Sequence, residues 1–148
     1  MSKKEIKYRF LIDKRGNWFQ DGIKIQHRVT YLYNNKLLKR DEDGEYYLDE
    51  GSGKLYIKVD DTPFVVKMVH KKGEDYYLVL NDETQEKLDL NTLSINSDNI
   101  PYAKIKNGEF DARFTRAAYY EFMKDLKKED ENFYIILDGD KHFLKKIL

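Results

Sequence analysis

Hydrophobic and polar residues alternate along much of the chain in short runs, the pattern expected of half-buried β-strands. Turn residues separate these runs, and Asn107-Gly108 favours a tight hairpin between two of them. The predicted strands are Arg9–Ile12, Trp18–Gln20, residues 45–48, Leu55–Val59, Phe64–Lys71, Tyr76–Leu80, Glu86–Leu90, Tyr102–Ile105, Phe110–Phe114, Phe133–Leu137 and Phe143–Ile147. Because short turns join most of them, we expect mainly antiparallel sheet.

Two other stretches repeat their apolar residues at the period of a helix. The first extends from His27 to Leu38 and the second from about Arg116 to Lys128. One face is shared by Val29, Leu32, Tyr33 and Leu37 in the first helix, and one by Tyr119, Phe122, Met123 and Leu126 in the second. We predict that the second of these faces packs in the core. The pattern as a whole predicts an α+β fold with two helices.

The two ends of the chain resemble each other. Each contains a hairpin, a tyrosine-bearing helix followed by basic residues, an acidic turn and a strand, with EYYL at 45–48 matching FYIIL at 133–137. This repetition predicts an internal duplication with two similar halves. We place the first half at residues 1–62 and the second at residues 63–148.

Composition excludes several classes of protein. The 148 residues carry 27 basic and 27 acidic side chains, with +4 net in residues 1–74 and −4 in residues 75–148. This imbalance is too small for a nucleic-acid-binding or membrane-adhesive surface. No cysteine is present, and no apolar run approaches the ~20 residues of a membrane helix. The charged start, MSKKEIKY, lacks the apolar region of a signal peptide, so we expect a cytoplasmic protein.

Motifs for catalysis, cofactors and metals fail on inspection. GSGK at 51–54 suggests a phosphate loop, but Leu48 and Leu55 occupy positions where that motif needs glycine and serine or threonine. The three histidines have no spacing typical of a metal site. We therefore assign no catalytic residue, no cofactor and no metal, and an enzyme acting on nucleotides or phosphoesters is the least favoured function.

The stretch FTRAAYYEF, residues 114–122, carries the most chemistry. Arg116 and Tyr120 are four residues apart on the border of the apolar helix face, and Arg113 lies just upstream. A guanidinium beside a phenol ring near a helix N-terminus suits a phosphate, a carboxylate or a flat base. The alternative is a structural arginine paired with Asp60, Asp61 or Asp111. The residues alone favour this structural alternative about two to one.

Four segments in the same order resemble the bacterial DUF1285 family over roughly residues 10–125. They are IDKRGNWFQDGIKI at 12–25, RDEDGEYYL at 40–48, KLYIKVDDTPF at 54–64 and AKIKNGEFDARFTRAAYYEF at 103–122. The resemblance implies a duplicated α+β core whose second half is pleckstrin-homology-like. It also implies a nucleotide-like ligand between the halves and a role in signal transduction, and it does not imply an enzymatic activity. The ligand-binding residues that it implies are Lys54, Asp60, Arg113, Arg116 and Tyr120.

Two functions therefore remain in view. The first is a non-enzymatic regulatory or signalling module that binds a small anionic, nucleotide-like ligand between its halves. The alternative is a protein–protein interaction module that uses its pleckstrin-homology-like surface or a sheet edge. Neither involves nucleic acid or a membrane.

Overall fold

A computed structural model describes residues 8–147. The residues before Tyr8, on which the expectation about a signal peptide depends, lie outside the described part. The first strands and helix are β1 (Phe10–Ile12), β2 (Trp18–Gln20), β3 (Ile23–Lys24), α1 (Arg28–Leu37), β4 (Leu38–Arg40), β5 (Tyr46–Asp49) and β6 (Lys54–Val59). Next come β7 (Phe64–Lys72), β8 (Asp75–Leu80), β9 (Gln85–Lys87), the short 3₁₀ helix η2 (Leu90–Thr92), β10 (Ser94–Ile95), β11 (Pro101–Ile105) and β12 (Phe110–Phe114). The last elements are α2 (Arg116–Met123), β13 (Lys127–Glu129), β14 (Asn132–Leu137), β15 (Asp140–Phe143) and β16 (Lys145–Lys146).

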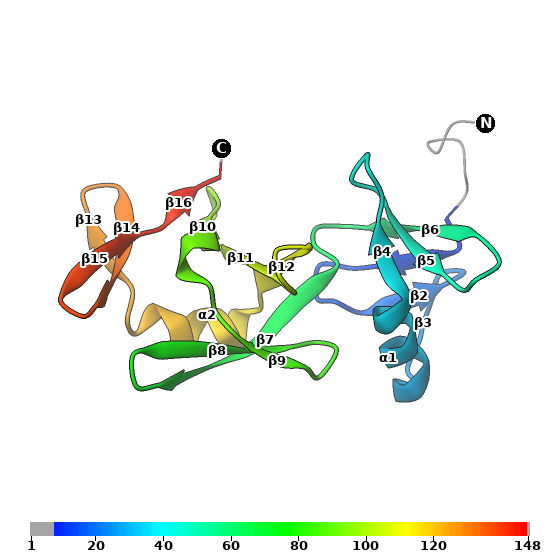
Figure 1. The fold of residues 1–148 in the computed structure, drawn as a ribbon, viewed down its shortest axis with the longest axis horizontal. Helices are drawn as coiled ribbons and strands as arrows, with labels where there is room; N and C mark the ends of the chain where they lie inside the picture. The colour runs from blue at the N-terminus through cyan, green and yellow to red at the C-terminus, as the bar shows by residue number, and fades with distance from the viewer. Residues whose placement is uncertain (1–7, 148) are drawn as a thin grey trace. The chain divides into compact units, whose positions relative to one another are not determined.

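The chain divides into two compact units, the first ending at Pro63 and the second beginning at Phe64 (Figure 1). In the first unit, six strands form a sheet in the order β3-β2-β1-β6-β5-β4. Neighbouring strands are antiparallel except at the centre, where β1 and β6 run parallel with Ile12 opposite Val59. The first and last strands of the unit therefore meet in the middle of its sheet.

The second unit repeats this arrangement. Its sheet has the order β9-β8-β7-β12-β11-β10, with β16 added at the edge beside β10. Again the first and last strands of the repeat, β7 and β12, form the central parallel pair, and the other pairs within the repeat are antiparallel. The α+β fold with two similar halves is confirmed.

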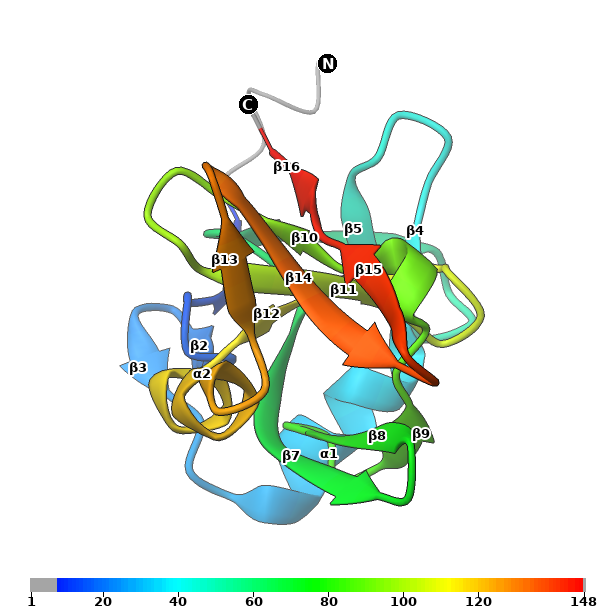
Figure 2. The same ribbon diagram turned by 90° about the vertical axis from the view of Figure 1, so that its left-hand side faces the viewer.

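The correspondence between the halves differs from the one expected. The sequence matched the two helices with each other, and EYYL of β5 with FYIIL of β14. In the structure, β1 to β6 correspond in order and pairing to β7 to β12. Helix α1 lies between the third and fourth strands of its unit, whereas α2 follows the sixth. The helices are therefore not equivalent, and β14 lies outside the repeat in a separate three-stranded sheet, β13-β14-β15 (Figure 2).

Helix α2 is shorter than predicted. It ends at Met123, and a turn at Lys124 and Asp125 leads to β13, which pairs with β14. The predicted helix therefore included residues that form an edge strand. Among residues 8–147, no helix is long and apolar enough to cross a membrane.

The buried face of α2 also differs in part from the prediction. Ala118 and Phe122 are fully buried, and the Phe122 ring packs edge-on against Phe114 of β12 and Tyr76 of β8. Tyr119 is half-buried, whereas 40% of Met123 is exposed. The core face is therefore centred on Ala118 and Phe122, which are four residues apart, and Met123 lies at its border.

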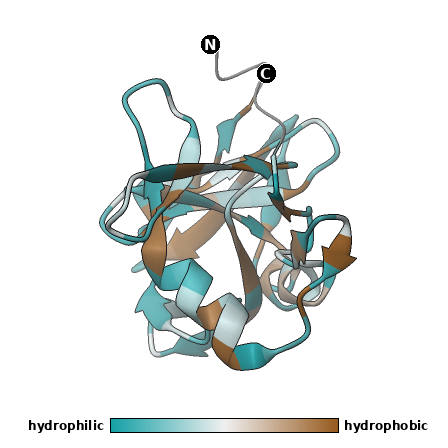
Figure 3. Ribbon diagram, turned by 90° about the vertical axis from the view of Figure 1, so that its right-hand side faces the viewer, coloured by the Kyte–Doolittle hydropathy of each residue, from teal (hydrophilic) through white to brown (hydrophobic). Residues whose placement is uncertain are grey.

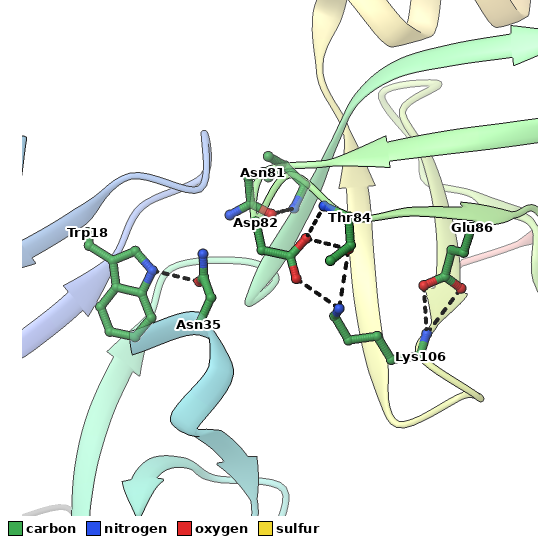
Figure 4. A network of polar contacts seen from close by, with 8 residues as sticks. Trp18, Asn35, Asn81, Asp82, Thr84, Glu86 and Lys106 are labelled. Carbon is green, nitrogen blue, oxygen red and sulfur yellow. Dashed lines mark hydrogen bonds and ion pairs between the residues drawn. The ribbon is translucent and has the colours of Figure 1, made fainter. Parts of the chain in front are cut away.

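Helix α1 buries only the borders of its predicted apolar face, where Leu32 and Leu37 are half-buried, although an amphipathic helix usually buries the whole of this face. Val29 is 66% exposed and Tyr33 is 55% exposed, while Asn34 and Asn35 are buried. The indole N–H of buried Trp18 donates a 2.8 Å hydrogen bond to Oδ1 of Asn35 (Figure 4). This bond fixes which side of α1 faces the sheet of its own unit.

We expect Asn35→Ala to destabilise the protein by about 1–3 kcal/mol, because the buried indole N–H of Trp18 would lose its acceptor. Urea unfolding followed by tryptophan fluorescence measures the loss. Asn91→Ala, at an exposed asparagine, is the matched control and should change the unfolding free energy by less than about 0.5 kcal/mol. An equally stable Asn35→Ala variant would contradict this role for the Trp18–Asn35 bond.

Candidate functional site

The junction between β12 and α2 is built on strand β7. The backbone N–H of Thr115 donates a 3.0 Å hydrogen bond to the carbonyl of Val66, which continues the parallel pairing of the two strands. The Thr115 hydroxyl accepts a 3.3 Å bond from the N–H of Ala118 and donates a 3.3 Å bond to the carbonyl of Lys67. Thr115 therefore caps α2 and fixes its N-terminus beside the middle of β7.

Arg116 and Tyr120 form a pair on the exposed side of this helix. Nη2 of Arg116 lies 3.5 Å from the Tyr120 hydroxyl, and the guanidinium lies 5.8 Å from the centre of the ring. Tyr120 is 54% exposed, and its ring also contacts that of Tyr119, with 6.1 Å between centroids. Within the described residues no carboxylate pairs with Arg116. The guanidinium of Arg116 is therefore held near a phenol. The structural alternative required an ion pair with an aspartate, and this pair is not formed in the part of the chain that the structure describes.

Lys67 is a second cation beside the helix N-terminus, and the sequence analysis missed it. The pairing of β7 with β8 shifts register between Val66 and Met68, so Lys67 is the extra residue of a β-bulge. Its side chain is exposed, and its carbonyl is the one bonded to Thr115. A bulge depends on the partner strand and is not visible in alternation. The only sequence clue is the unbroken apolar run Phe64-Val65-Val66 before the lysine.

The other predicted site residues lie elsewhere. Arg113 is half-buried on β12, and it alternates with Ala112 and Phe114, whose face packs on α2. Its side chain therefore leaves the strand on the opposite face from α2. Lys54 and Asp60 belong to the first unit, at the start of β6 and just after its end. Lys54 lies 4.9 Å from the centre of the Tyr47 ring. Their contribution to a ligand site stays a prediction.

Lys106, at the turn between β11 and β12, has several polar contacts within the second unit (Figure 4). Its ammonium lies 2.8 Å from Asp82 and 3.4 Å from the Thr84 hydroxyl, and its backbone N–H donates to both carboxylate oxygens of Glu86 at 3.1 Å. The ammonium also lies 5.0 Å from the centre of the Phe64 ring. These contacts tie two hairpin turns together, so the cluster is structural.

Asp82 and Tyr76 of the second unit have shifted pKa values. Burial by itself would raise the pKa of Asp82, but hydrogen bonds from Lys106 and Thr84 outweigh burial and hold the pKa below its usual value. Burial raises the pKa of Tyr76, and the hydrogen bond from its hydroxyl to Asp125 at 3.0 Å raises it further. Tyr76 therefore remains a neutral donor that ties β8 to the end of α2.

One open pocket of about 450 Å³ lies within the second unit, away from the predicted residues. It is lined by Asp75, Lys87, Leu88, Asp89, Leu90, Asn91, Leu137 and His142. Its main charges are already paired, because Lys87 bonds Asp75 at 3.2 Å and Asp89 caps η2. No group of histidine and carboxylate side chains suited to a metal ion occurs in residues 8–147. The unneutralised Arg116 is therefore the stronger candidate for binding an anion.

These features define an α+β protein of two similar halves with a cationic strand–helix junction in the second. No family model matches the chain, and no curated protein matches its sequence. A DUF1285 family protein from Silicibacter pomeroyi DSS-3 has a similar structure, with a TM-score of 0.75 and 22% identity over 94% of this chain and 80% of that one. A DUF1285 family protein from Shewanella baltica OS155 gives a TM-score of 0.67 and 19% identity over 79% of this chain and 91% of that one. The fold is that of the DUF1285 proteins, as the resemblance in sequence predicted.

The lowered pKa of Asp82 predicts a dependence of stability on pH. The folded pKa lies below the unfolded value of about 3.9, so this carboxylate stabilises the fold above that pH and loses its contribution as pH falls through the folded pKa. Asp82→Asn should therefore lower the unfolding free energy at pH 7 and have a smaller effect near pH 3. Urea unfolding at both pH values tests this, with Asp98→Asn as the exposed control. Equal effects of Asp82→Asn at the two pH values would argue against the Lys106 cluster as the cause.

Proposed function

We propose that the protein is a non-enzymatic regulatory module that binds a small anionic, nucleotide-like ligand at the junction of β12 and α2. The observation that carries the proposal is the exposed guanidinium of Arg116, held 5.8 Å from the centre of the Tyr120 ring without a carboxylate partner among the described residues. Lys67, beside the helix cap, adds a second positive charge.

The chemistry of the junction suits a phosphate joined to a flat ring. A guanidinium can donate two parallel hydrogen bonds to phosphate oxygens, and the N-terminus of a helix favours negative charge. The half-exposed Tyr120 ring offers a flat surface on which a base can stack. In this proposal these residues bind the ligand and do not break any of its bonds. The regulatory role is proposed because of the resemblance to the DUF1285 family.

The proposal predicts stabilisation by nucleotides that depends on Arg116. A nucleotide at about 100 times its dissociation constant should stabilise the folded protein by about 2.7 kcal/mol, seen as a rise in Tm. ATP, GMP, cyclic AMP and inorganic phosphate are the probes in a thermal-shift series. Arg116→Ala and Lys67→Ala should each reduce the shift, because each removes one positive charge from the site.

Arg15→Ala removes an exposed arginine from the turn between β1 and β2 and is the matched control. It should leave the nucleotide-induced shift unchanged. The proposal fails if none of the probes raises Tm, or if Arg116→Ala responds to every probe as strongly as the unaltered protein. Tyr120→Ala distinguishes binding of the base from binding of the phosphate. It should weaken the binding of nucleotides more than the binding of inorganic phosphate.

The alternative function, a protein-interaction module, is supported by the small sheet of the second unit. Tyr134 and Phe143 are paired across strands with 5.4 Å between ring centroids, and Phe143 and Ile136 are 49% and 43% exposed. The sheet has β13 and β15 at its edges (Figure 2). Exposed aromatic residues beside an unpaired strand edge suit a partner that adds a strand.

On this alternative, Phe143→Ser should reduce the capture of partner proteins from a lysate of the source organism. Arg116→Ala should leave the capture unchanged. Quantitative mass spectrometry of proteins retained by the immobilised chain measures both. Identical captured proteins for Phe143→Ser and the unaltered chain would count against this surface.

A further inference from the structure

Helix α1 presents an apolar surface that the proposed ligand site does not use. Val29 and Tyr33 are one helical turn apart and are 66% and 55% exposed. Ile23, on the edge strand β3 just before the helix, is 74% exposed. We call Ile23, Val29 and Tyr33 the α1 surface. Figure 3 shows the helix facing the viewer, with hydrophobic and hydrophilic bands along its length.

The first unit cannot cover this surface with its own sheet. Asn34 and Asn35 are buried, and the bond from Trp18 to Asn35 holds this side of the helix against the sheet. At 100° per residue, Val29 and Tyr33 lie on the opposite side of the helix. Turning the apolar side inward would break the Trp18–Asn35 bond and expose the indole. The apolar side is therefore held outward by a specific buried contact.

The charge around the α1 surface indicates what covers it. Residues 22–40 contain five lysines and arginines and no aspartate or glutamate. Lys36 is exposed and lies on the same side of the helix as Tyr33, three residues further on. An apolar stripe flanked by positive charge is complementary to an apolar stripe flanked by negative charge.

A second copy of the chain does not fit this surface. In a two-fold dimer, the same patch of both copies meets, so the positive charge of Lys36 would be brought against a patch of the same sign. Like charges placed opposite each other across an interface oppose binding.

We propose that the α1 surface binds an acidic amphipathic helix of another protein. Apolar side chains of the partner, spaced at i, i+3 and i+4, would contact Val29 and Tyr33, and flanking glutamates or aspartates would face Lys36. A short helix that packs on another helix needs only a few apolar anchors of this kind. This site lies in the first unit and is independent of the proposed anion site.

The test uses the full chain and a defined probe. The probe is a fluorescein-labelled 18-residue peptide with leucines at i, i+3 and i+4 and glutamates at the other positions. Fluorescence anisotropy should show saturable binding that weakens as salt is raised. Val29→Ser combined with Tyr33→Ser should weaken binding at least about tenfold, and Lys36→Glu should weaken it in the same direction. A peptide with the glutamates replaced by lysines should not bind.

Met68→Ser is the matched control, since Met68 is 50% exposed on β7 of the second unit. It should bind the acidic peptide as the unaltered chain does. Circular dichroism and Tm confirm that the variants fold, as expected for exposed positions. Arg116→Ala should bind the peptide normally, so failure of the nucleotide proposal leaves this result unaffected.

Three outcomes would overturn the proposal. The first is no binding of the acidic peptide, or equal binding by the Val29→Ser/Tyr33→Ser variant. The second is that Val29 and Tyr33 are needed for sedimentation with anionic phosphatidylserine vesicles but not for binding of the peptide. This result would assign the surface to a membrane. The third is concentration-dependent dimerisation in analytical ultracentrifugation that these substitutions abolish, which would assign it to a second copy.

Discussion

The parallel pairing of β7 with β12 determines how the second unit is built. This pair brings the end of the six-strand repeat back to its beginning, with Phe114 opposite Val66. The next residue, Thr115, continues the pairing through its backbone and caps α2 through its hydroxyl. The place of α2 on the sheet, and with it the position of Arg116 and Tyr120, therefore follows from the register of two strands that are distant in sequence. The first unit has the same closure, where the N–H of Asp60 bonds the carbonyl of Ile12 at 2.9 Å.

The comparison of these two closures explains why two predicted site residues, Asp60 and Arg116, have different surroundings. Asp60 and Thr115 occupy equivalent positions, each directly after the last strand of its repeat. After Asp60 the chain passes through Thr62 and Pro63, both buried, into β7. After Thr115 it forms a helix, so only the second unit presents a helix N-terminus at this position. The segment after the last strand of the repeat therefore connects to the next unit in the first case and forms the helix of a candidate binding site in the second.

Local patterns in the sequence predicted most of the strands, the beginnings of both helices and the Arg116–Tyr120 pair, because alternation, turn residues and helical spacing act over a few residues. The features that were missed depend on distant partners. The bulge that displays Lys67 arises from the register with β8. The orientation of α1 arises from the bond between Asn35 and Trp18. Lys127–Glu129 forms a strand because β14 offers it a partner, although the residues suit a helix equally well.

The two parallel pairs, β1 with β6 and β7 with β12, also affect how the protein folds. Each joins segments about fifty residues apart, so a long loop must lose its freedom before either pair gains its hydrogen bonds. The hairpins between neighbouring strands form over much shorter distances and can assemble first. Helix α2 is short, and its cap depends on the carbonyl of Lys67 in β7. We infer that the junction carrying Arg116 is completed only when β12 has docked, so this part of the surface takes shape at a late step of folding.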